Sequence, residues 1–233
     1  MKAFRIFLAM IALASATNVS AQKFLSAEPA EEAFNLGVRV GVNTSNRTFG
    51  KGYFNEWNKN SWGTGFEAGV VANLNMRDYF SLQPGFFFES RSGNYSYAQS
   101  YFDSTGEKQK TALLGHYRSY NFTVPVMASF RFNLSHSLRW TVEAGPYAQF
   151  RIHSDDNDKI KVISPQVNAN DPVTAVYAKA SNFDAGLKIG TGLLFRGHYS
   201  FNVHYLAGGR KAWKAPHSGG SNKAWTFTLG YDF

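Results

Sequence analysis

The stretch "AWTFTLGYDF" at residues 224–233 decides the expected fold. Taken alternately, its residues separate into two sets. One set is apolar or aromatic: Trp225, Phe227, Leu229, Tyr231 and Phe233. The other set is small or polar: Ala224, Thr226, Thr228, Gly230 and Asp232. Because successive side chains of a β-strand point to opposite faces, we expect a strand with one apolar and one polar face.

The same alternation recurs along the chain, in the residue ranges 33–43, 62–75, 79–91, 118–133, 138–151, 182–195 and 199–210. Short connections lie at 75–78, 133–137 and 196–198, and long polar segments at 44–61, 92–117, 152–181 and 211–222. Short turns at one rim and long loops at the other are the plan of an outer-membrane barrel. The sequence therefore predicts an all-β fold, an eight-stranded antiparallel transmembrane β-barrel with short periplasmic turns and long extracellular loops.

Composition narrows the class of protein. The chain has 233 residues, 16% aromatics, 21 glycines, no cysteine and a formal charge of +8. A mean hydropathy of −0.30 argues against a bundle of membrane helices. Without disulfides, an exported protein needs a large core or a closed hydrogen-bonded sheet for its stability.

The N-terminus has the features of a secretory signal. Lys2 and Arg5 precede an apolar run over 6–16, and small residues follow at 19–21. The run is shorter than the roughly 20 residues that span a bilayer. We expect a cleaved signal peptide at 1–21, a periplasmic lead-in at 22–32 and the barrel at 33–233; the alternative for the first segment is an uncleaved anchor.

A soluble, lipocalin-like barrel with its apolar face inward is the structural alternative. Glycines on the polar face argue against it. In a crowded concave interior a residue without a side chain leaves room for its neighbours, whereas on a solvated face it only weakens the strand. Aromatics also gather near both ends of the expected strands, as in the two interfacial girdles of a membrane barrel. These aromatics are Phe34, Phe80, Phe132, Trp140, Phe195, Tyr199 and Phe233 at one end, and Trp62, Phe88, Tyr120, Phe150, Phe183, Tyr205 and Trp225 at the other.

The polar faces carry charges of both signs. They are Arg39, Glu67, Glu89, Arg131, Arg139, Glu143, Asp184, Lys188 and His204. Since an eight-stranded barrel is just filled by side chains, we expect a packed interior charge network rather than a channel. A narrow ion path is the alternative.

Several stretches resemble a known family. The signal peptide, "FNLGVRVGVN", "YFSLQPGFFFE", "YNFTVPVMASFRF", "NFDAGLKIGTGLLF" and "FTLGYDF" together look like the PorT-like outer-membrane β-barrel family, including Pro125 and the Asp184–Gly186 pattern. The resemblance covers residues from about 33 onward and implies the barrel. The family's named member serves protein secretion across the outer membrane. The last strand, Trp225 to Phe233, also resembles the C-terminal assembly signal of outer-membrane proteins; the alternative is that Phe233 is only the last girdle residue.

Candidate chemistry is sparse. His153, Ser154 and Asp155 have the residue types of a hydrolase triad, but adjacent residues do not converge as a triad must. The acidic run 155–158 could hold Ca²⁺ yet lacks the loop pattern of such a site, so a solvated turn is favoured. A basic cluster at one rim could meet lipopolysaccharide phosphates. It consists of Arg210, Lys211, Lys214 and Lys223.

Three functions remain open. The first is an integral outer-membrane barrel whose loops bind or scaffold at the surface of a Gram-negative cell. The second is a PorT-type secretion component with a membrane or periplasmic partner. The third is a lipid-modifying enzyme, which would need His116, His153 and Ser154 to converge. We favour the first, with no catalytic, cofactor or metal residues. Its expected partners are outer-membrane lipid, lipopolysaccharide and the assembly machinery, and nucleic acid is not among them.

Overall fold

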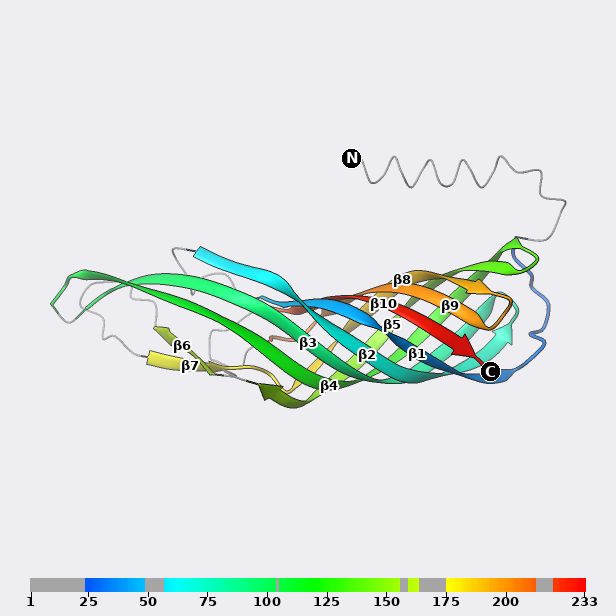
Figure 1. The fold of residues 1–233 in the computed structure, drawn as a ribbon, viewed down its shortest axis with the longest axis horizontal. Coiled ribbons are helices and arrows are strands. Elements are labelled where there is room, and N and C mark those ends of the chain that lie inside the picture. The colour runs from blue at the N-terminus through cyan, green and yellow to red at the C-terminus, as the bar shows by residue number, and fades with distance from the viewer. Residues whose placement is uncertain (1–23, 49–56, 104, 156–158, 164–174, 213–219) are drawn as a thin grey trace, which may run out of the picture.

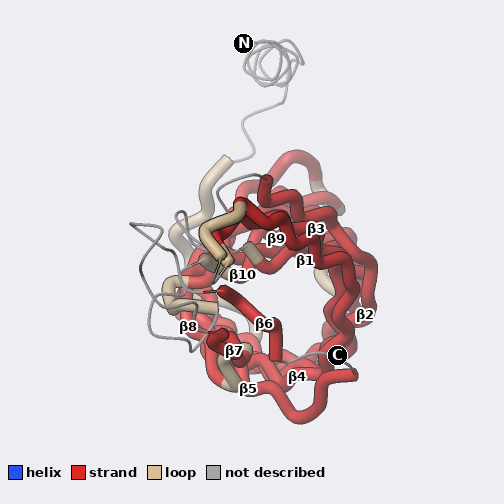
Figure 2. Tube along the Cα trace, turned by 90° about the vertical axis from the view of Figure 1, so that its left-hand side faces the viewer, coloured by secondary structure: helices blue, strands red, loops and turns tan. Residues whose placement is uncertain are grey.

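A computed structural model describes residues 24–48, 57–103, 105–155, 159–163, 175–212 and 220–233. The barrel strands are β1 (Phe34–Arg47), β2 (Trp57–Arg77), β3 (Phe80–Phe102), β4 (Lys108–Ser135), β5 (Leu138–Asp155), β8 (Phe183–Phe195), β9 (Tyr199–Gly208) and β10 (Asn222–Asp232). They close into one antiparallel ring in the order β1-β10-β9-β8-β5-β4-β3-β2 (Figure 1, Figure 2). The predicted eight-stranded barrel is confirmed.

The ring closes where the last strand meets the first. β10 pairs with β1 in continuous register from Gly37 opposite Asp232 to Arg47 opposite Asn222. Closure matters because an open sheet edge in lipid would leave backbone groups without hydrogen-bond partners. The terminal backbone N–H of Phe233 continues this seam by donating to the carbonyl of Leu36 at 2.8 Å.

The two faces of the wall differ as the alternation predicts. Leu229 is 62% exposed and Val40 is 58% exposed on the outer face, whereas Glu67 and Thr226 are almost completely buried inside. An outer face of exposed aliphatic and aromatic side chains suits lipid rather than water. The lipocalin-like alternative, with its apolar face inward, is therefore wrong.

Aromatic side chains pack together near both ends of the barrel wall. At the short-turn end the packed pairs are Phe80–Phe130, Phe132–Trp140, Tyr199–Tyr231 and Tyr231–Phe233. At the other end they are Phe66–Phe88, Phe88–Tyr120, Phe150–Phe183 and Tyr205–Trp225. Two such belts mark the levels at which a barrel wall meets the two membrane interfaces.

Glycines in the wall make room for the longest inward side chains. Gly230 lies opposite Arg39, and a Cβ added there would collide with the Arg39 side chain. Gly190 lies opposite His204, and a Cβ added there would collide with the imidazole ring. The narrow interior thus holds large polar groups because their neighbours have no side chain.

The long polar segments are more ordered than the sequence predicts. Most of the expected loop 92–117 is strand, because β3 and β4 stay paired from Phe80–Phe130 to Phe102–Lys108. β2 begins at Trp57 and pairs with the same extension. Within the expected loop 152–181, β6 (Lys159–Ile163) and β7 (Ala175–Lys179) form a separate two-stranded sheet. In Figure 1 the β3–β4 extension projects far beyond the ring.

The turns at the opposite rim are short, as predicted. They lie at Asp78–Tyr79, His136–Ser137 and Arg196–His198. In the last turn Arg196 and Gly197 both have positive φ angles, of 51° and 75°, which is the conformation of a tight hairpin turn that favours glycine.

The N-terminal lead-in lies along this short-turn rim. The backbone N–H of Asn133 donates to the carbonyl of Phe24 at 2.9 Å, and that of Asp78 donates to Glu28 at 3.0 Å. The ring of Phe24 stacks on Phe132 with centroids 5.1 Å apart. The expected signal peptide, 1–21, lies outside the described residues. Among the residues that are described, no helix has the length and apolar character needed to cross a membrane.

Candidate functional site

The barrel lumen is the candidate site, because the predicted charged residues point into it. Seven of them are buried there: Arg39, Glu67, Glu89, Glu143, Asp184, Lys188 and His204. The other two, Arg131 and Arg139, are half-buried near the short-turn rim. Charges in so confined a space require partners, since an isolated buried charge carries a large desolvation penalty.

Ion pairs close the short-turn end of the lumen. Arg39 Nη2 lies 2.7 Å from Asp232 Oδ1, and Arg139 Nη1 lies 2.9 Å from Asp78 Oδ1. Arg131 donates from Nη2 to Asn75 Oδ1 at 2.9 Å and to Ser81 Oγ at 3.0 Å. Asp78 belongs to the β2–β3 turn, so its pair with Arg139 joins two neighbouring hairpins.

Beyond these pairs, toward the same rim, the lumen opens into a cavity of about 590 Å³. Its lining includes acidic residues from the N-terminal lead-in and basic residues from the turns and strand ends. The charged groups are Glu31, Glu32, Asp78, Asp232, Arg131, Arg139 and Arg196. This mouth, which is periplasmic in the predicted orientation, is roomy, whereas the lumen deeper in is closely packed.

The middle of the lumen combines a histidine–carboxylate contact with a cation–π contact. His204 Nε2 lies 2.6 Å from Glu143 Oε2. The ammonium of Lys188 lies 4.9 Å from the centroid of the Phe87 ring, a cation–π contact. The cavity at this level is about 30 Å³, which is room for two or three water molecules, given about 10–15 Å³ for each. No wide path for solutes passes through this level of the described barrel.

A second network fills the outer half of the lumen. Arg91 binds Glu89 Oε2 through Nη2 at 2.6 Å and through Nε at 2.7 Å. Gln149 donates to the same oxygen at 3.2 Å. Asp184 accepts from the Tyr147 hydroxyl and from Asn222 Nδ2, each at 3.1 Å. These contacts join β3, β5, β8 and β10 across the ring and hold the wall in a fixed shape.

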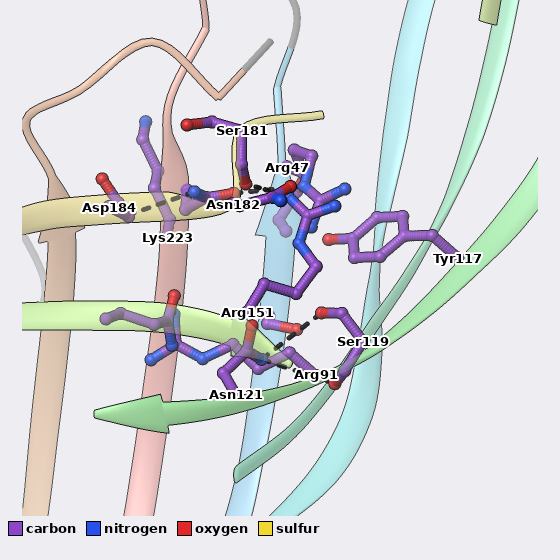
Figure 3. Close-up of a pocket in the computed structure, with 14 residues that line it drawn as sticks. Arg47, Arg91, Tyr117, Ser119, Asn121, Arg151, Ser181, Asn182, Asp184 and Lys223 are labelled. Atoms are coloured by element: carbon purple, nitrogen blue, oxygen red, sulfur yellow. Dashed lines mark hydrogen bonds between the residues drawn. The ribbon is translucent and has the colours of Figure 1, made fainter. Parts of the chain in front are cut away.

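The mouth at the opposite end, which is the extracellular mouth in the predicted orientation, is narrow and basic. Arg47 stacks on the Tyr117 ring with its Cζ 4.3 Å from the centroid, and its Nε donates to Asn222 Oδ1 at 3.2 Å. Arg151 donates from Nη2 to the carbonyl of Ser181. Figure 3 shows these residues around one small cavity at the end of the lumen.

The residues considered for hydrolysis do not converge. His153 lies opposite Tyr120 and stacks on its ring on the outer face of the wall. Ser154, the next residue along the strand, points the other way and donates to the carbonyl of Arg118. His116 is exposed on β4, beyond the last residue pair between β4 and β5. The described residues therefore do not bring these three side chains to one site.

Other expected sites are only partly visible. Residues 156–158 of the acidic run and Lys214 of the basic cluster lie outside the described residues. Within the described ranges, no three His, Asp or Glu side chains gather as ligands for a metal ion. Arg210 and Lys211 are exposed, and Arg210 lies over the Phe183 ring at 5.2 Å.

The predicted assembly signal forms an outward stripe on β10. Trp225, Phe227, Leu229 and Phe233 are each at least 40% exposed on the outer face. Tyr231 is half-buried and packs edge-on against Phe233 with centroids 5.3 Å apart. This stripe faces the position of lipid, and its contacts with any assembly partner stay a prediction.

Important inward residues were missed from the sequence. Arg47 lies beyond the end of the predicted strand 33–43, whereas Arg91 and Arg151 are the last residues of the predicted strands 79–91 and 138–151 and were not assigned to the inner face. Asp232 was placed on the polar face of the last strand, but its ion pair with Arg39 was not predicted. The aromatic residue Tyr147 points inward, against the rule that the inner face is polar. A longer alternation window would have found Arg47, and the alternation carried to the last residue of each predicted strand would have found Arg91 and Arg151.

These features define a class: a small outer-membrane β-barrel with an apolar outer wall, two aromatic belts and a filled polar lumen. A family model described as "Outer membrane protein beta-barrel domain" matches residues 20–208. The chain belongs to this family and is an integral protein of the Gram-negative outer membrane. No curated protein matches the chain.

Solved structures of small barrels are similar to this chain. Neisserial surface protein A is 10% identical, with a TM-score of 0.43 over 87% of this chain and 100% of the other. OprG from Pseudomonas aeruginosa is 10% identical, with a TM-score of 0.41 over 87% and 97%. Ail of Yersinia pestis, in complex with the heparin analogue sucrose octasulfate, is 11% identical, with a TM-score of 0.39 over 87% and 100%.

Proposed function

We propose that this barrel is a surface-binding protein rather than a porin, and that its extracellular end carries the binding function. The observation behind the proposal is the length of the β3–β4 hairpin. On β3, the outer aromatic belt lies at Phe88, and the strand continues to Phe102. Fourteen further residues at about 3.3 Å each give roughly 45 Å of strand beyond the belt. Such an extension has no use in a wall that only spans lipid.

The extension is built to hold its shape outside the membrane. Tyr95 and Tyr97 are buried and stack with centroids 5.2 Å apart. The Tyr97 hydroxyl donates to Asn60 Oδ1 on β2 at 2.9 Å, and this bond holds β2 against the β3–β4 hairpin. A folded three-stranded sheet above the membrane offers a rigid surface, and a rigid surface loses less entropy on binding than a flexible loop.

The filled lumen supports the same proposal. Buried ion pairs toward both ends, with the His204–Glu143 contact between them, leave only water-sized space in the middle of the barrel. Transport of large solutes would require these pairs to separate. The function is therefore assigned to the outer surface, where the extended strands and the basic mouth are accessible.

The test compares the full chain with a variant in which residues 94–116 are replaced by an Asn-Gly turn. Both are purified in detergent and applied to arrays of immobilised glycans and of lipopolysaccharide. We expect both proteins to show the heat-modifiable gel mobility of a folded barrel, and the shortened variant to lose at least tenfold in binding. Equal binding by the two proteins, or no binding by either, would contradict the proposal.

A second candidate function is support of protein secretion from the periplasmic side. It is favoured by the charged cavity at the short-turn rim and by the lead-in fixed along that rim. A photo-crosslinking residue at Glu31 in native membranes tests it, with Glu107 at the hairpin tip as the control position. A discrete crosslinked periplasmic partner at Glu31 alone supports the role, and identical patterns at both positions contradict it.

A further inference from the structure

The extracellular mouth contains a small cavity to which most of the ring contributes. Its charged and aromatic lining comes from β1, β3, β4, β5, β8 and β10 (Figure 3). The residues are Arg47, Arg91, Tyr117, Arg151, Asp184 and Lys223. Side chains from so many strands are held by the closed sheet itself, so the cavity has a fixed shape.

The charge balance of this lining is positive. Its only carboxylate among the described residues is Asp184, whose oxygens accept from Tyr147, from Asn222 and from the backbone N–H of Ala185. Four basic side chains against this one carboxylate give the lining a net positive charge. Glu89 lies deeper and compensates Arg91 alone, through the two contacts described above.

The guanidinium groups are positioned for binding from outside. Arg47 is fixed by its stack on Tyr117 and by its bond to Asn222. Arg151 is fixed by its bond to Ser181. A planar guanidinium carries five N–H donors, and its fork geometry matches the oxygens of phosphate and sulfate. Ser119 and Asn121 add neutral polar groups to the lining.

The size of the cavity limits what can enter. Its volume is about 20 Å³, whereas a single water needs about 10–15 Å³. One or two oxygen atoms of a ligand fit inside, and the remainder must stay outside the mouth. The cavity therefore suits the charged end of a larger molecule.

We propose that this cavity binds a tetrahedral oxyanion, the phosphate or sulfate group at the end of a surface saccharide or lipid headgroup. Arg47, Arg151 and Lys223 bind the anionic oxygens, and Arg91 fixes the floor of the site. The inference rests on the proposed surface-binding function and names the chemistry of its ligand. Donors from opposite sides of the ring fit a tetrahedral group better than a planar carboxylate.

The first experiment measures anion binding by the full chain in detergent, at pH 7 and constant ionic strength. Inorganic phosphate and sulfate are titrated by calorimetry into the wild type, Arg151→Gln, Lys223→Gln and the control Lys108→Gln. Lys108 is exposed at the hairpin tip, so its substitution removes the same charge far from the cavity. Heat-modifiable gel mobility establishes that each variant is folded.

We expect saturable binding by the wild type and Lys108→Gln, at least tenfold weaker binding by Arg151→Gln, and several-fold weaker binding by Lys223→Gln. If Arg151→Gln does not fold, the anion affinities of Lys223→Gln and Lys108→Gln are compared, and this comparison alone decides the outcome. Absence of saturable binding by the wild type would overturn the proposal. An equal loss in all variants would also overturn it, because net charge rather than the cavity would then govern binding.

Two further arms identify the source of the group. The same proteins are titrated with a phosphorylated sugar, and with lipopolysaccharide before and after enzymatic dephosphorylation. Binding of the sugar alone assigns a soluble or glycan phosphate, and phosphatase-sensitive binding of lipopolysaccharide assigns the lipid headgroup. Binding that Arg151→Gln leaves unchanged in both arms would overturn the site. If the hairpin still governs surface binding in that case, the proposed function stands without this ligand.

Discussion

Arg39 and Asp232 form an ion pair across the seam of the barrel, where the first strand meets the last. Their Nη2 and Oδ1 atoms are 2.7 Å apart, and both side chains are only 8% exposed. Asn73 on β2 donates to the same Asp232 oxygen at 3.1 Å. Two polar contacts therefore hold the last strand to β1 and β2 at the short-turn end.

Loss of the Asp232 charge should destabilise the barrel. Asp232→Asn keeps an acceptor for Asn73 but leaves the Arg39 guanidinium buried without a counter-charge, which costs about 3–5 kcal/mol. The double variant Arg39→Met with Asp232→Leu should recover most of this loss, since an apolar pair has no charge to desolvate. Denaturant unfolding in lipid vesicles measures both, and equal stability of Asp232→Asn and wild type would contradict the role of the pair.

The lumen should not conduct like a porin. In planar bilayers we expect no large, steady conductance from the purified protein, because the His204–Glu143 and Arg91–Glu89 pairs occupy the bore. Stable porin-like current steps would overturn this expectation. They would make Arg39, Glu67 and Glu143 candidates for selectivity residues.

The tip of the β3–β4 hairpin should lose order at low pH. The Thr105 hydroxyl and the Gln109 amide, followed by the backbone N–H groups of Glu107 and Thr105, lower the pKa of Asp103 to about 2. A carboxylate whose folded pKa is depressed stabilises the fold above its unfolded pKa, near 3.9, and the stabilisation is lost as pH falls toward 2.

Amide hydrogen exchange of Thr105 and Glu107 measures this effect. Protection should be constant above about pH 4, with the intrinsic pH dependence of exchange removed, and should decline between about pH 4 and pH 2. Asp103→Ala should show low protection at every pH. A wild-type profile that is flat down to pH 2 would contradict the assignment to Asp103.

The alternation of side chains predicted the lipid-embedded wall well and the rest less well. In β10, lipid outside and a polar lumen inside give the two faces a strong contrast, so the pattern is clear. Above the membrane this contrast reverses, since Tyr95 and Tyr97 are buried while Asn94 is exposed. We looked for strands with an apolar outward face, and we therefore predicted a loop at 92–117.

The alternation pattern also could not predict which charged residues contact each other inside the lumen. Alternation places Arg39 and Asp232 on the inner face, but their contact depends on which residues of β1 and β10 lie opposite each other. That register is set by closure of the whole ring. Glu89 and Arg91 both lie in the predicted strand 79–91, where residues two apart share a face, so the pattern could have predicted their contact had Arg91 also been assigned to the inner face.

Phe233 should matter for assembly more than its contacts suggest. As an interfacial aromatic it contributes about 1–3 kcal/mol of buried apolar surface to the inserted barrel. If it also belongs to the assembly signal, its deletion should leave unfolded chain in the periplasm although the purified variant still folds in detergent. Phe227→Ala, on the same outward stripe, controls for lost apolar area. Equal, mild defects of both variants in gel mobility of outer-membrane fractions would leave Phe233 as a girdle residue only.

The orientation of the barrel is the claim on which the surface-binding account depends, and cysteine labelling tests it most directly. The chain has no cysteine of its own, so single substitutions report without background. Thr105→Cys lies at the tip of the β3–β4 hairpin, and His136→Cys lies in the β4–β5 turn. On intact cells, an impermeant thiol reagent should label Thr105→Cys and leave His136→Cys unlabelled until the outer membrane is permeabilised. Labelling of His136→Cys alone, or of both positions on intact cells, would contradict the account.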